Sequence, residues 1–355
     1  MKKIIFILTI SLLLFSCSSE KKEDKKNVKD QTKIEESQSS DTQNTSISAE
    51  DNESTNTVQN SSELYTLTYK FPKNKELKYL VTQTSDTKVN AETKDSTNTV
   101  SKKRVLTNNV KVVMVDVNKD KSYDLDITVE DFNLDFNVNG ETKNYSSQNI
   151  PAKRKDKRNI DYHIALLNNK FSVTLSNKGK ILLIAETDDI VEELLRINSK
   201  GQTIEAVDKA PYSERLIDNV LLPFTKNIFK KLPINPVTPD SVWHERFSQR
   251  IGQFILDNSF DFQIAGILDD NVVKIKIGVT SKIIKEIDQF ADSTQVFTMK
   301  PQFKGNGSIY FDYEKGIVKN IHLETTHEYE FKDLGAEAKP LVHYLIKDIL
   351  DVKLK

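Results

Sequence analysis

The chain has 355 residues, with 51 basic and 52 acidic side chains, and its formal net charge of -1 provides no overall field that would hold nucleic acid. Its one cysteine excludes a disulfide scaffold and any zinc or iron–sulfur site built from cysteines. We therefore expect no nucleic-acid partner, and the motifs point to no metal and no other cofactor.

The N-terminus has the pattern of a lipoprotein signal. A short basic start, Met1–Lys3, precedes an apolar run at 4–15, which has the length of a signal peptide's hydrophobic region and is too short to cross a bilayer as a mature helix. The run leads to Leu14-Phe15-Ser16-Cys17, which resembles a bacterial lipobox. We expect residues 1–16 to be cleaved and Cys17 to carry acyl chains such as palmitate, which anchor the protein to a membrane. The alternative is an ordinary secretory signal with an incidental cysteine.

Residues 17–62 have the composition of a tether. Positions 18–62 contain five hydrophobic side chains and no aromatic one, too few to offset the entropy of an ordered chain. We therefore expect a lipidated Cys17 followed by a disordered polar linker. Serine after the cysteine resembles the signal that sorts lipoproteins to the outer membrane of a cell envelope. The sequence leaves both the periplasmic and the surface face of that membrane open.

Residues 63–355 form the folded body, which begins with alternating antiparallel strands. Strands are predicted at 64–71, 77–84, 110–117, 123–130 and 132–138, and a hairpin at 171–184. The alternation changes phase across Glu130-Asp131, which predicts a bulge or a break.

The middle and the end of the body are predicted to contain helices. Amphipathic patterns indicate one helix at 187–201 and another at 212–231, with a kink near Pro223. Lys226, Lys230 and Lys231 would let the second helix lie on a membrane, although packing against the sheet is the favoured interpretation. Strands resume from 242 to 331, and apolar residues at 341, 345, 349 and 352 predict a C-terminal helix at 336–352.

These elements predict an α+β fold: an antiparallel β-sheet with a central helix pair and a C-terminal helix. Similar hairpins near Lys178-Gly179 and Lys315-Gly316 suggest two related half-domains, 63–186 and 233–355, joined by helices at 187–232. The alternative is that all hairpins share such spacing.

One charged cluster and several histidines are the candidate site residues. Lys153, Arg154, Lys155, Lys157 and Arg158 form a basic run that would contact anionic headgroups or lipopolysaccharide phosphates, or would be an exposed loop.

The segment from His322 to His327 reads His-x-Glu-x-x-His, which differs from the zincin spacing, and on a strand these histidines would point to opposite faces. We expect His327 on the buried face with a hydrogen bond, and no metal site. Trp243 opens a strand and is expected in the core.

A resemblance rests on the middle of the chain. Phe171-x-Val-x-Leu175, Lys178-Gly179-Lys180, Leu232-Pro233-x-x-Pro236-Val237 and Asp240-Ser241-x-Trp243 resemble a family of uncharacterised lipoproteins with a domain of unknown function, common in Bacteroidota-type envelopes. The resemblance covers most of 64–331 and departs at Pro239, where glycine is usual, and in the predicted C-terminal helix. It implies an envelope location and an α+β body, and it supplies no catalytic residues.

The sequence therefore predicts a lipid-anchored envelope protein without enzymatic activity, whose body is a binding module with a hydrophobic ligand or an envelope protein as its partner. The alternatives are a surface-exposed structural or interaction subunit, and a hydrolase of unrecognised type. A hydrolase would need carboxylates converging on His244 or His322 in a cleft.

Overall fold

The computed structural model describes residues 64–355 except 199–208, 240, 269–270, 288–294 and 337–338. Within this part of the chain, twelve strands form one sheet, and all pairings between these strands are antiparallel. The strands are β1 (Glu76–Glu92), β2 (Thr97–Val117), β3 (Tyr123–Val138), β4 (Glu141–Ser146), β5 (Lys170–Leu175), β6 (Ile181–Ala185), β7 (Val242–Ile251), β8 (Phe254–Leu268), β9 (Val272–Glu286), β10 (Gln295–Asp312), β11 (Ile317–Asp333) and β12 (Leu341–Leu354).

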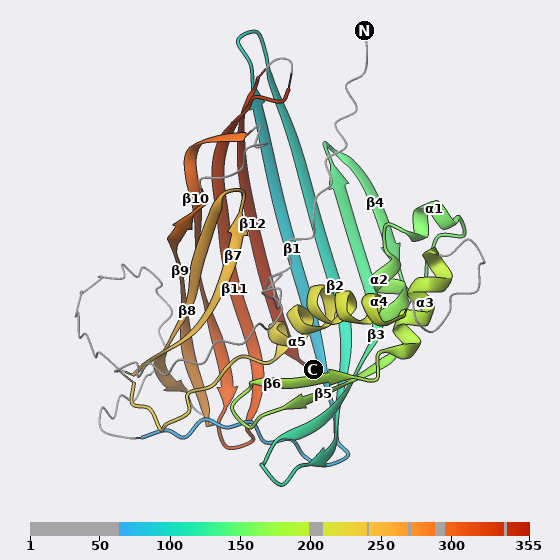
Figure 1. The fold of residues 1–355 in the computed structure, drawn as a ribbon. Coiled ribbons are helices and arrows are strands. Elements are labelled where there is room, and N and C mark those ends of the chain that lie inside the picture. Colours follow the sequence, from blue (N-terminus) through green and yellow to red (C-terminus); the bar gives the residue numbers. More distant parts are fainter. Residues whose placement is uncertain (1–63, 199–208, 240, 269–270, 288–294, 337–338) are drawn as a thin grey trace, which may run out of the picture.

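The sheet has the order β6-β5-β3-β2-β1-β12-β11-β10-β9-β8-β7, with β4 paired to the upper part of β3 (Figure 1). The first and the last of the described strands, β1 and β12, therefore meet in the middle. Strands β1–β6 form one wing of the sheet and β7–β11 form the other. The edges of the sheet are β6 and β7.

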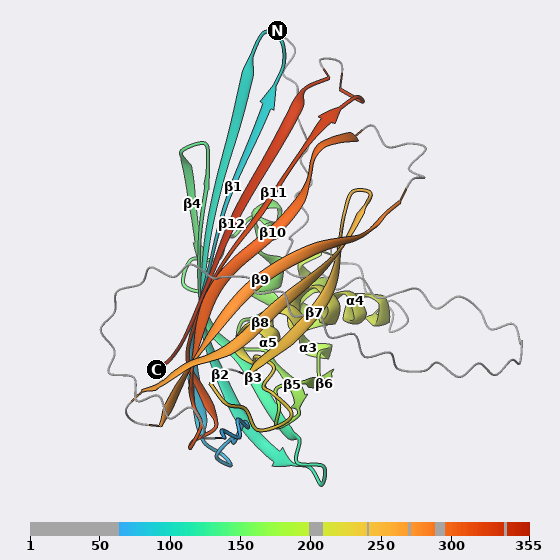
Figure 2. The ribbon, with the colours of Figure 1, turned by 90° about the vertical axis from the view of Figure 1, so that its left-hand side faces the viewer.

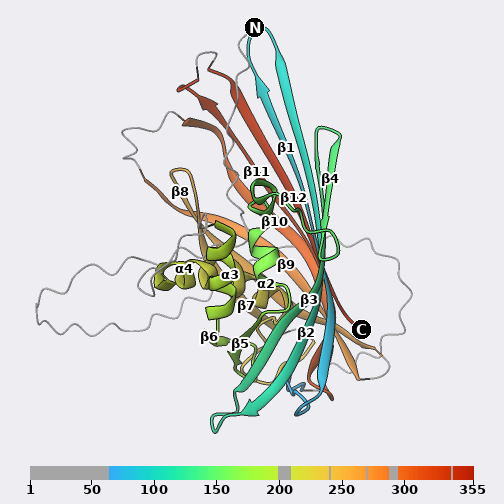
Figure 3. The same cartoon turned by 90° about the vertical axis from the view of Figure 1, so that its right-hand side faces the viewer.

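The sheet is strongly curved, and helices α2 to α5 lie on its concave face (Figures 2 and 3). The described helices are α1 (Arg154–Lys157), α2 (Asp161–Leu166), α3 (Asp188–Asn198), α4 (Lys209–Leu216) and α5 (Leu222–Ile228), and a π-helical turn, Ile217–Leu221, joins the last two. The long upper ends of β1, β2 and β10–β12 extend beyond the helices (Figure 1). This arrangement confirms the predicted α+β class.

Side chains alternate between an apolar concave face and a polar convex face. On β1, Tyr79 and Val81 are buried on the concave face, whereas Lys78 and Thr82 point to the convex face. The predicted phase change at Glu130 is confirmed as a β-bulge, because Asn109 pairs with Asp131 while Val110 pairs with Val129. The extra residue on β3 keeps apolar side chains on the concave face both before and after it.

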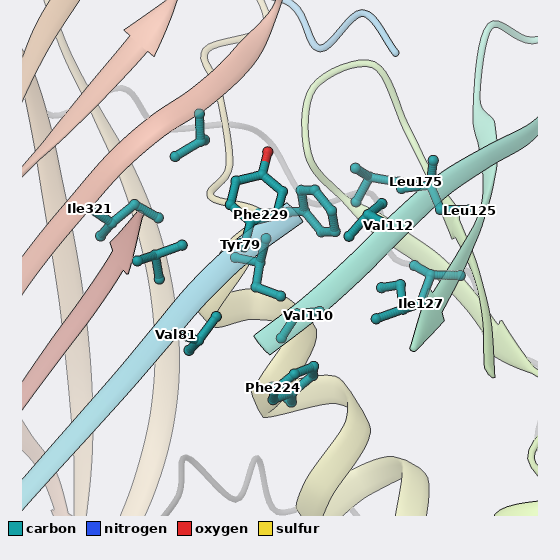
Figure 4. Packing of buried hydrophobic residues seen from close by; sticks show 14 of the residues in the cluster. Tyr79, Val81, Val110, Val112, Leu125, Ile127, Leu175, Phe224, Phe229 and Ile321 are labelled. Atoms are coloured by element: carbon teal, nitrogen blue, oxygen red, sulfur yellow. The ribbon is translucent and has the colours of Figure 1, made fainter. Parts of the chain in front are cut away.

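The main hydrophobic core fills the space between the concave face and the helices. Figure 4 shows side chains of β1, β2, β3 and the α5 segment converging there, with Phe224 and Phe229 contributed by the helical segment. Fully burying an apolar side chain of this size contributes about 1.5–3 kcal/mol. The second predicted helix therefore packs on the sheet through its apolar side.

At the position of the predicted kink, this helix has a π-helical turn before Pro223. The backbone N–H of Leu222 bonds to the Ile217 carbonyl oxygen, five residues back. Proline lacks an N–H and cannot continue the regular α-helical ladder, so the wider turn accommodates it.

The first described segment, 65–71, is extended but lies outside the sheet, and the prediction of a regular strand there is wrong. The backbone of Tyr65 forms an isolated β-bridge with Val237. The Tyr69 N–H donates to the Asn177 carbonyl oxygen at 2.8 Å, in the β5–β6 turn. The Lys70 N–H donates to the Gly316 carbonyl oxygen at 2.9 Å, in the β10–β11 turn. The segment thus connects the β5–β6 turn with the β10–β11 turn across the lower end of the sheet (Figure 1).

The predicted C-terminal helix at 336–352 is also wrong: this part of the chain contains strand β12, in the centre of the sheet. Val342, Leu350 and Val352 are buried on the concave face. Leu345 and Ile349 point to the convex face, so apolar residues on both faces mimicked helical spacing. Pairing with β1 and β11 satisfies the backbone on both sides and overrides the local preference for helix.

Candidate functional site: a pocket between α5 and the sheet

A pocket lies on the concave face where α5 crosses strands of the second wing. Its walls come from α5 and the residues after it and from β7, β8, β9 and β11, and its volume is about 40 Å³. The lining residues are Pro223, Lys226, Asn227, Lys230, Glu245, Phe247, Phe260, Phe262, Ile277 and Leu323. A volume of this size holds a small polar group or a few methylenes, so a longer molecule would extend along the concave face.

The sheet side of the pocket is an aromatic wall. Phe247 of β7 and Phe260 of β8 stack with ring centroids 5.5 Å apart, and Phe262 follows at 6.5 Å from Phe260. Trp243 stacks on Phe262 at 5.6 Å, and its indole N–H donates to the Lys231 carbonyl oxygen at 3.0 Å. Because the three phenylalanines alternate with polar residues on two adjacent strands, they share the concave face.

The helix side of the pocket is polar and cationic. Asn227 and Lys230 are only 5% and 9% exposed, whereas Lys226 is half-buried. Burial lowers the pKa of the Lys230 ammonium from 10.5 to about 8; Glu245 opposes this shift and Lys226 adds to it. The pocket therefore combines an apolar wall with a buried amine.

The backbone of Lys230 is fixed by two distant parts of the chain. The buried Tyr69 hydroxyl is hydrogen-bonded to it, and Gly179 of the β5–β6 turn packs directly against its carbonyl oxygen. Gly179 has a φ of +80°, and a Cβ there would overlap this oxygen and would lie 2.8 Å from the Tyr69 ring.

A second polar cluster lies on the concave face near β1, β2 and β12. Arg104 Nη2 lies 3.0 Å from His163 Nε2 of α2, and burial with the adjacent Arg104 charge lowers the pKa of His163 to about 3. Burial raises the pKa of Asp348, which the Arg104 charge partly offsets. Arg104 and His163 are thus partnered with each other, in contrast to the amine of the pocket.

The predicted site residues lie away from this pocket. Cys17, the predicted tether and the signal region are outside the described residues. The basic cluster of Lys153, Arg154, Lys155, Lys157 and Arg158 forms α1 and its flanks, on the opposite flank of the sheet from β7 and β8 (Figure 1). Lys153 and Arg158 are exposed and Lys157 is half-buried. None of the described helices is long and apolar enough to span a membrane.

The histidines singled out for hydrolysis or metal binding lie mainly on the convex face. His244 Nδ1 is 2.7 Å from Asp261, and His322 Nδ1 is 2.7 Å from Asp351. Both pairs are on the face opposite the pocket. Among the described residues, no group of three or more His, Cys, Asp or Glu side chains is placed to hold a metal ion.

His327 is buried on the concave face, as predicted, and its ring stacks on Phe303 at 4.1 Å. Within the described chain its Nδ1 has no hydrogen-bond partner, so the predicted hydrogen bond is not found there. The reason is that its neighbours on this face, Phe303 and Ile346, are apolar.

The pocket residues were not recognisable as a site in the sequence. Lys226 and Lys230 stood out as basic residues at the end of a helix, but Glu245 and the three phenylalanines belong to strands that alternate like any others. The remaining signal was the presence of Phe247, Phe260 and Phe262 on adjacent predicted strands. Only the pairing register of β7 with β8 shows that the three side chains lie next to one another on one face.

Two comparisons with known proteins give no information on function. No curated protein matches the chain. A solved structure described as "lipid-protein interactions in lipovitellin" is similar at 10% identity with a TM-score of 0.46, over 81% of this chain and 25% of that one. The chain thus spans a quarter of the length of that lipovitellin chain.

The comparison with protein families covers the region that builds the pocket's helix and most of its wall. A family of unknown function, DUF6263, matches residues 120–318, from the start of β3 to the start of β11. This is more than half of the chain, although less than the 64–331 of the resemblance described above. The chain therefore belongs to the DUF6263 family of unknown function.

Proposed function

We propose that this protein is a lipid-anchored envelope protein whose body is a non-enzymatic binding module for a hydrophobic ligand. The observation that carries the proposal is the pocket between α5 and the aromatic wall of β7 and β8. An apolar concave site with a few polar groups is the usual form of a small-molecule site. The wall offers such a surface through Phe247, Phe260 and Phe262.

The concave face above the helices extends this apolar surface. Phe331 and Val342 are buried there with Tyr329 and Tyr344 packed against them, and the Tyr329 and Tyr344 rings stack at 5.0 Å. In Figure 1 this part of the sheet rises above the helix layer. Tyr329 and Tyr344 are the half-buried part of this cluster, so an apolar chain that reached it would contact their rings.

The anchor and the location rest on the sequence of the N-terminus. Cys17 in its lipobox-like context supports acylation and an outer-membrane location, with the periplasmic or surface face as the two options. Membrane fractionation of the full chain carrying Cys17→Ala tests this part. We expect the variant in the soluble fraction, and a variant that still sediments with membranes would contradict the anchor.

Native mass spectrometry after gentle purification tests the binding module. We expect the full chain to retain lipid or another apolar molecule, and Phe260→Ala to retain less, because it removes part of the wall. Phe136→Ala on β3 is the matched control, since Phe136 is also half-buried but lies in the other wing. Protein that is always empty, or equal retention by both variants, would contradict the proposal.

A surface-exposed interaction subunit is the second candidate, and the edge strand β6 favours it. Leu182 and Leu183 are 46% and 57% exposed on this strand. Exposed apolar residues at a sheet edge are a usual site for pairing with another chain. Protease treatment of intact cells tests this candidate, because a protein that stays uncleaved is not presented at the surface.

A further inference from the structure

Two buried polar side chains face the pocket without a partner. Asn227 and Lys230 line the pocket and are 5% and 9% exposed. Across the described ranges, neither side chain has a hydrogen bond or an ion pair. Buried amines and amides are normally hydrogen-bonded, because the loss of water is otherwise uncompensated. The donor atoms of these two side chains are not among the fully buried, unpartnered atoms of the described chain, so they are reached from the pocket, where a group that accepts hydrogen bonds can take the place of water.

The charges around the pocket favour an anion. Lys226 lies four residues before Lys230 and lines the same pocket, and Glu245 is the one carboxylate among the lining residues. Two positive charges against one negative charge leave the lining cationic. Lys230 and Glu245 form no ion pair within 4.0 Å in the part of the chain that the structure describes, so the amine is not already neutralised by contact.

We propose that this pocket binds the anionic headgroup of an acyl-chain amphiphile, with Lys226, Asn227 and Lys230 donating to the headgroup. The proposal rests on the hydrophobic-ligand function and names its ligand class. The chain lies on Phe247, Phe260 and Phe262, which are lined up beside these donors. A carboxylate and a phosphate share the required chemistry, since both accept several hydrogen bonds from amines and amides.

The competing explanation is that Lys230 merely balances Glu245 across the pocket. On that explanation, removing the Glu245 charge would leave a buried, unbalanced cation and would not alter selectivity between headgroups. On our proposal, Glu245 repels the bound anion, so Glu245→Gln binds an anionic amphiphile more tightly than the native protein does.

The single tryptophan provides the readout. Trp243 stacks on Phe262 of the pocket wall, and bromine atoms on a bound chain quench indole fluorescence at short range. The full chain is titrated with a brominated twelve-carbon carboxylate, its methyl ester, the corresponding alkyl phosphate and the corresponding alkylammonium. Inorganic phosphate without a chain serves as a competitor.

We expect the two anionic amphiphiles to quench at concentrations at least tenfold lower than the ester, and the ammonium to bind most weakly. A lower quenching concentration for the carboxylate or for the phosphate shows which of the two headgroups the pocket favours. Inorganic phosphate competes only weakly, because it lacks the acyl chain. Lys230→Met and Lys226→Met both lower the preference for anions. Lys231→Met is the matched control, because Lys231 is exposed, is the next residue and does not line the pocket.

The outcomes separate this inference from the proposed function. Quenching by none of the probes contradicts the hydrophobic-ligand function itself. Equal affinities for the anion, the ester and the ammonium leave that function standing and overturn the headgroup assignment. An anion preference that survives in both Lys230→Met and Lys226→Met also overturns it.

Discussion

The hydroxyl of Tyr69 holds the backbone of Lys230 from both sides: it accepts from the Lys230 N–H at 2.9 Å and donates to the Lys230 carbonyl oxygen at 2.9 Å. The two residues are 161 positions apart, and Tyr69 is 1% exposed. One buried side chain from the first described segment thus fixes the position from which the Lys230 amine enters the pocket.

Replacing Tyr69 tests this positioning role. Tyr69→Phe leaves a buried N–H and a buried carbonyl without partners, so we expect the free energy of unfolding to fall by about 2–4 kcal/mol in urea denaturation. Tyr123→Phe is the control, because its hydroxyl makes one partly buried bond to the Tyr69 carbonyl oxygen at 3.0 Å. Its loss should be about 1 kcal/mol. Similar losses of stability in the two variants would show that the two hydrogen bonds from Tyr69 to the Lys230 backbone are unimportant.

The buried amine itself is expected to destabilise the protein at neutral pH. Because the pKa of Lys230 falls from 10.5 to about 8 on folding, the unfolded chain binds the additional proton between these pH values. The free energy of unfolding therefore rises with pH across that window, by up to about 3 kcal/mol.

Lys230→Met removes the cost of burying this charge, so we expect the variant to be more stable than the native protein at pH 7 and to lack this part of the alkaline rise. Denaturant unfolding from pH 7 to 10.5 provides the measurement, and Lys231→Met provides the exposed control. A Lys230→Met protein less stable than the native one at pH 7 would contradict the expectation. A residue that weakens the fold while facing a pocket is typical of a binding role.

His327 makes the fold sensitive to acid. Burial lowers its pKa from 6.5 to about 4, so below pH 6.5 the unfolded chain binds a proton that the folded protein excludes. The free energy of unfolding therefore decreases progressively as the pH falls from 6.5 to 4, by up to about 3 kcal/mol in total.

His327→Leu keeps an apolar side chain against Phe303 and cannot be protonated. We expect its thermal midpoint to fall less than that of the native protein between pH 7 and pH 4, with His244→Gln, on the exposed convex face, as the control. His163, whose pKa is also lowered by burial, would contribute to the remaining acid loss. Identical pH profiles for His327→Leu and the native protein would exclude this role.

The pairing of β1 with β12 can be tested by a cross-link. Lys88 lies opposite Leu345 across the two strands, which brings the backbones within the range of a disulfide. In the Cys17→Ala background, we expect Lys88→Cys with Leu345→Cys to form a disulfide on mild oxidation. Lys88→Cys with Ile349→Cys is out of register by four residues and should stay reduced. Mass spectrometry of alkylated protein distinguishes the two results, and a cross-link in the second pair alone would contradict the register.

Most of the strands could be predicted from the sequence, because one polar face and one apolar face impose strict alternation. The bulge at Glu130 was visible for the same reason, as a change of phase. The prediction failed at β12, where Leu345 and Ile349 place apolar side chains on the convex face and hide the period of two. It also failed at 65–71, where the chain is alternating and buried but bonds to turns rather than to a strand.

The pocket could not be predicted, because its parts are unremarkable separately. A lysine four residues after another lysine is usually part of a solvated helix face, and only the tertiary fold brings Lys230 into one pocket with Phe260 and Phe262. This juxtaposition depends on the curvature of the sheet and on the anchoring of Lys230 by Tyr69, and neither leaves a local pattern.

The position of the last strand has a consequence for how the chain acquires its structure. Strand β12 (Leu341–Leu354) pairs with β1 (Glu76–Glu92) on one side and with β11 on the other, so within the sheet it joins the two wings. Contacts this distant in sequence slow folding, and until they form, β1 and β11 present open edges. Until β12 is in place the folding chain therefore exposes two edges that are prone to aggregation, and removing β12 would leave β1 and β11 unpaired along these edges.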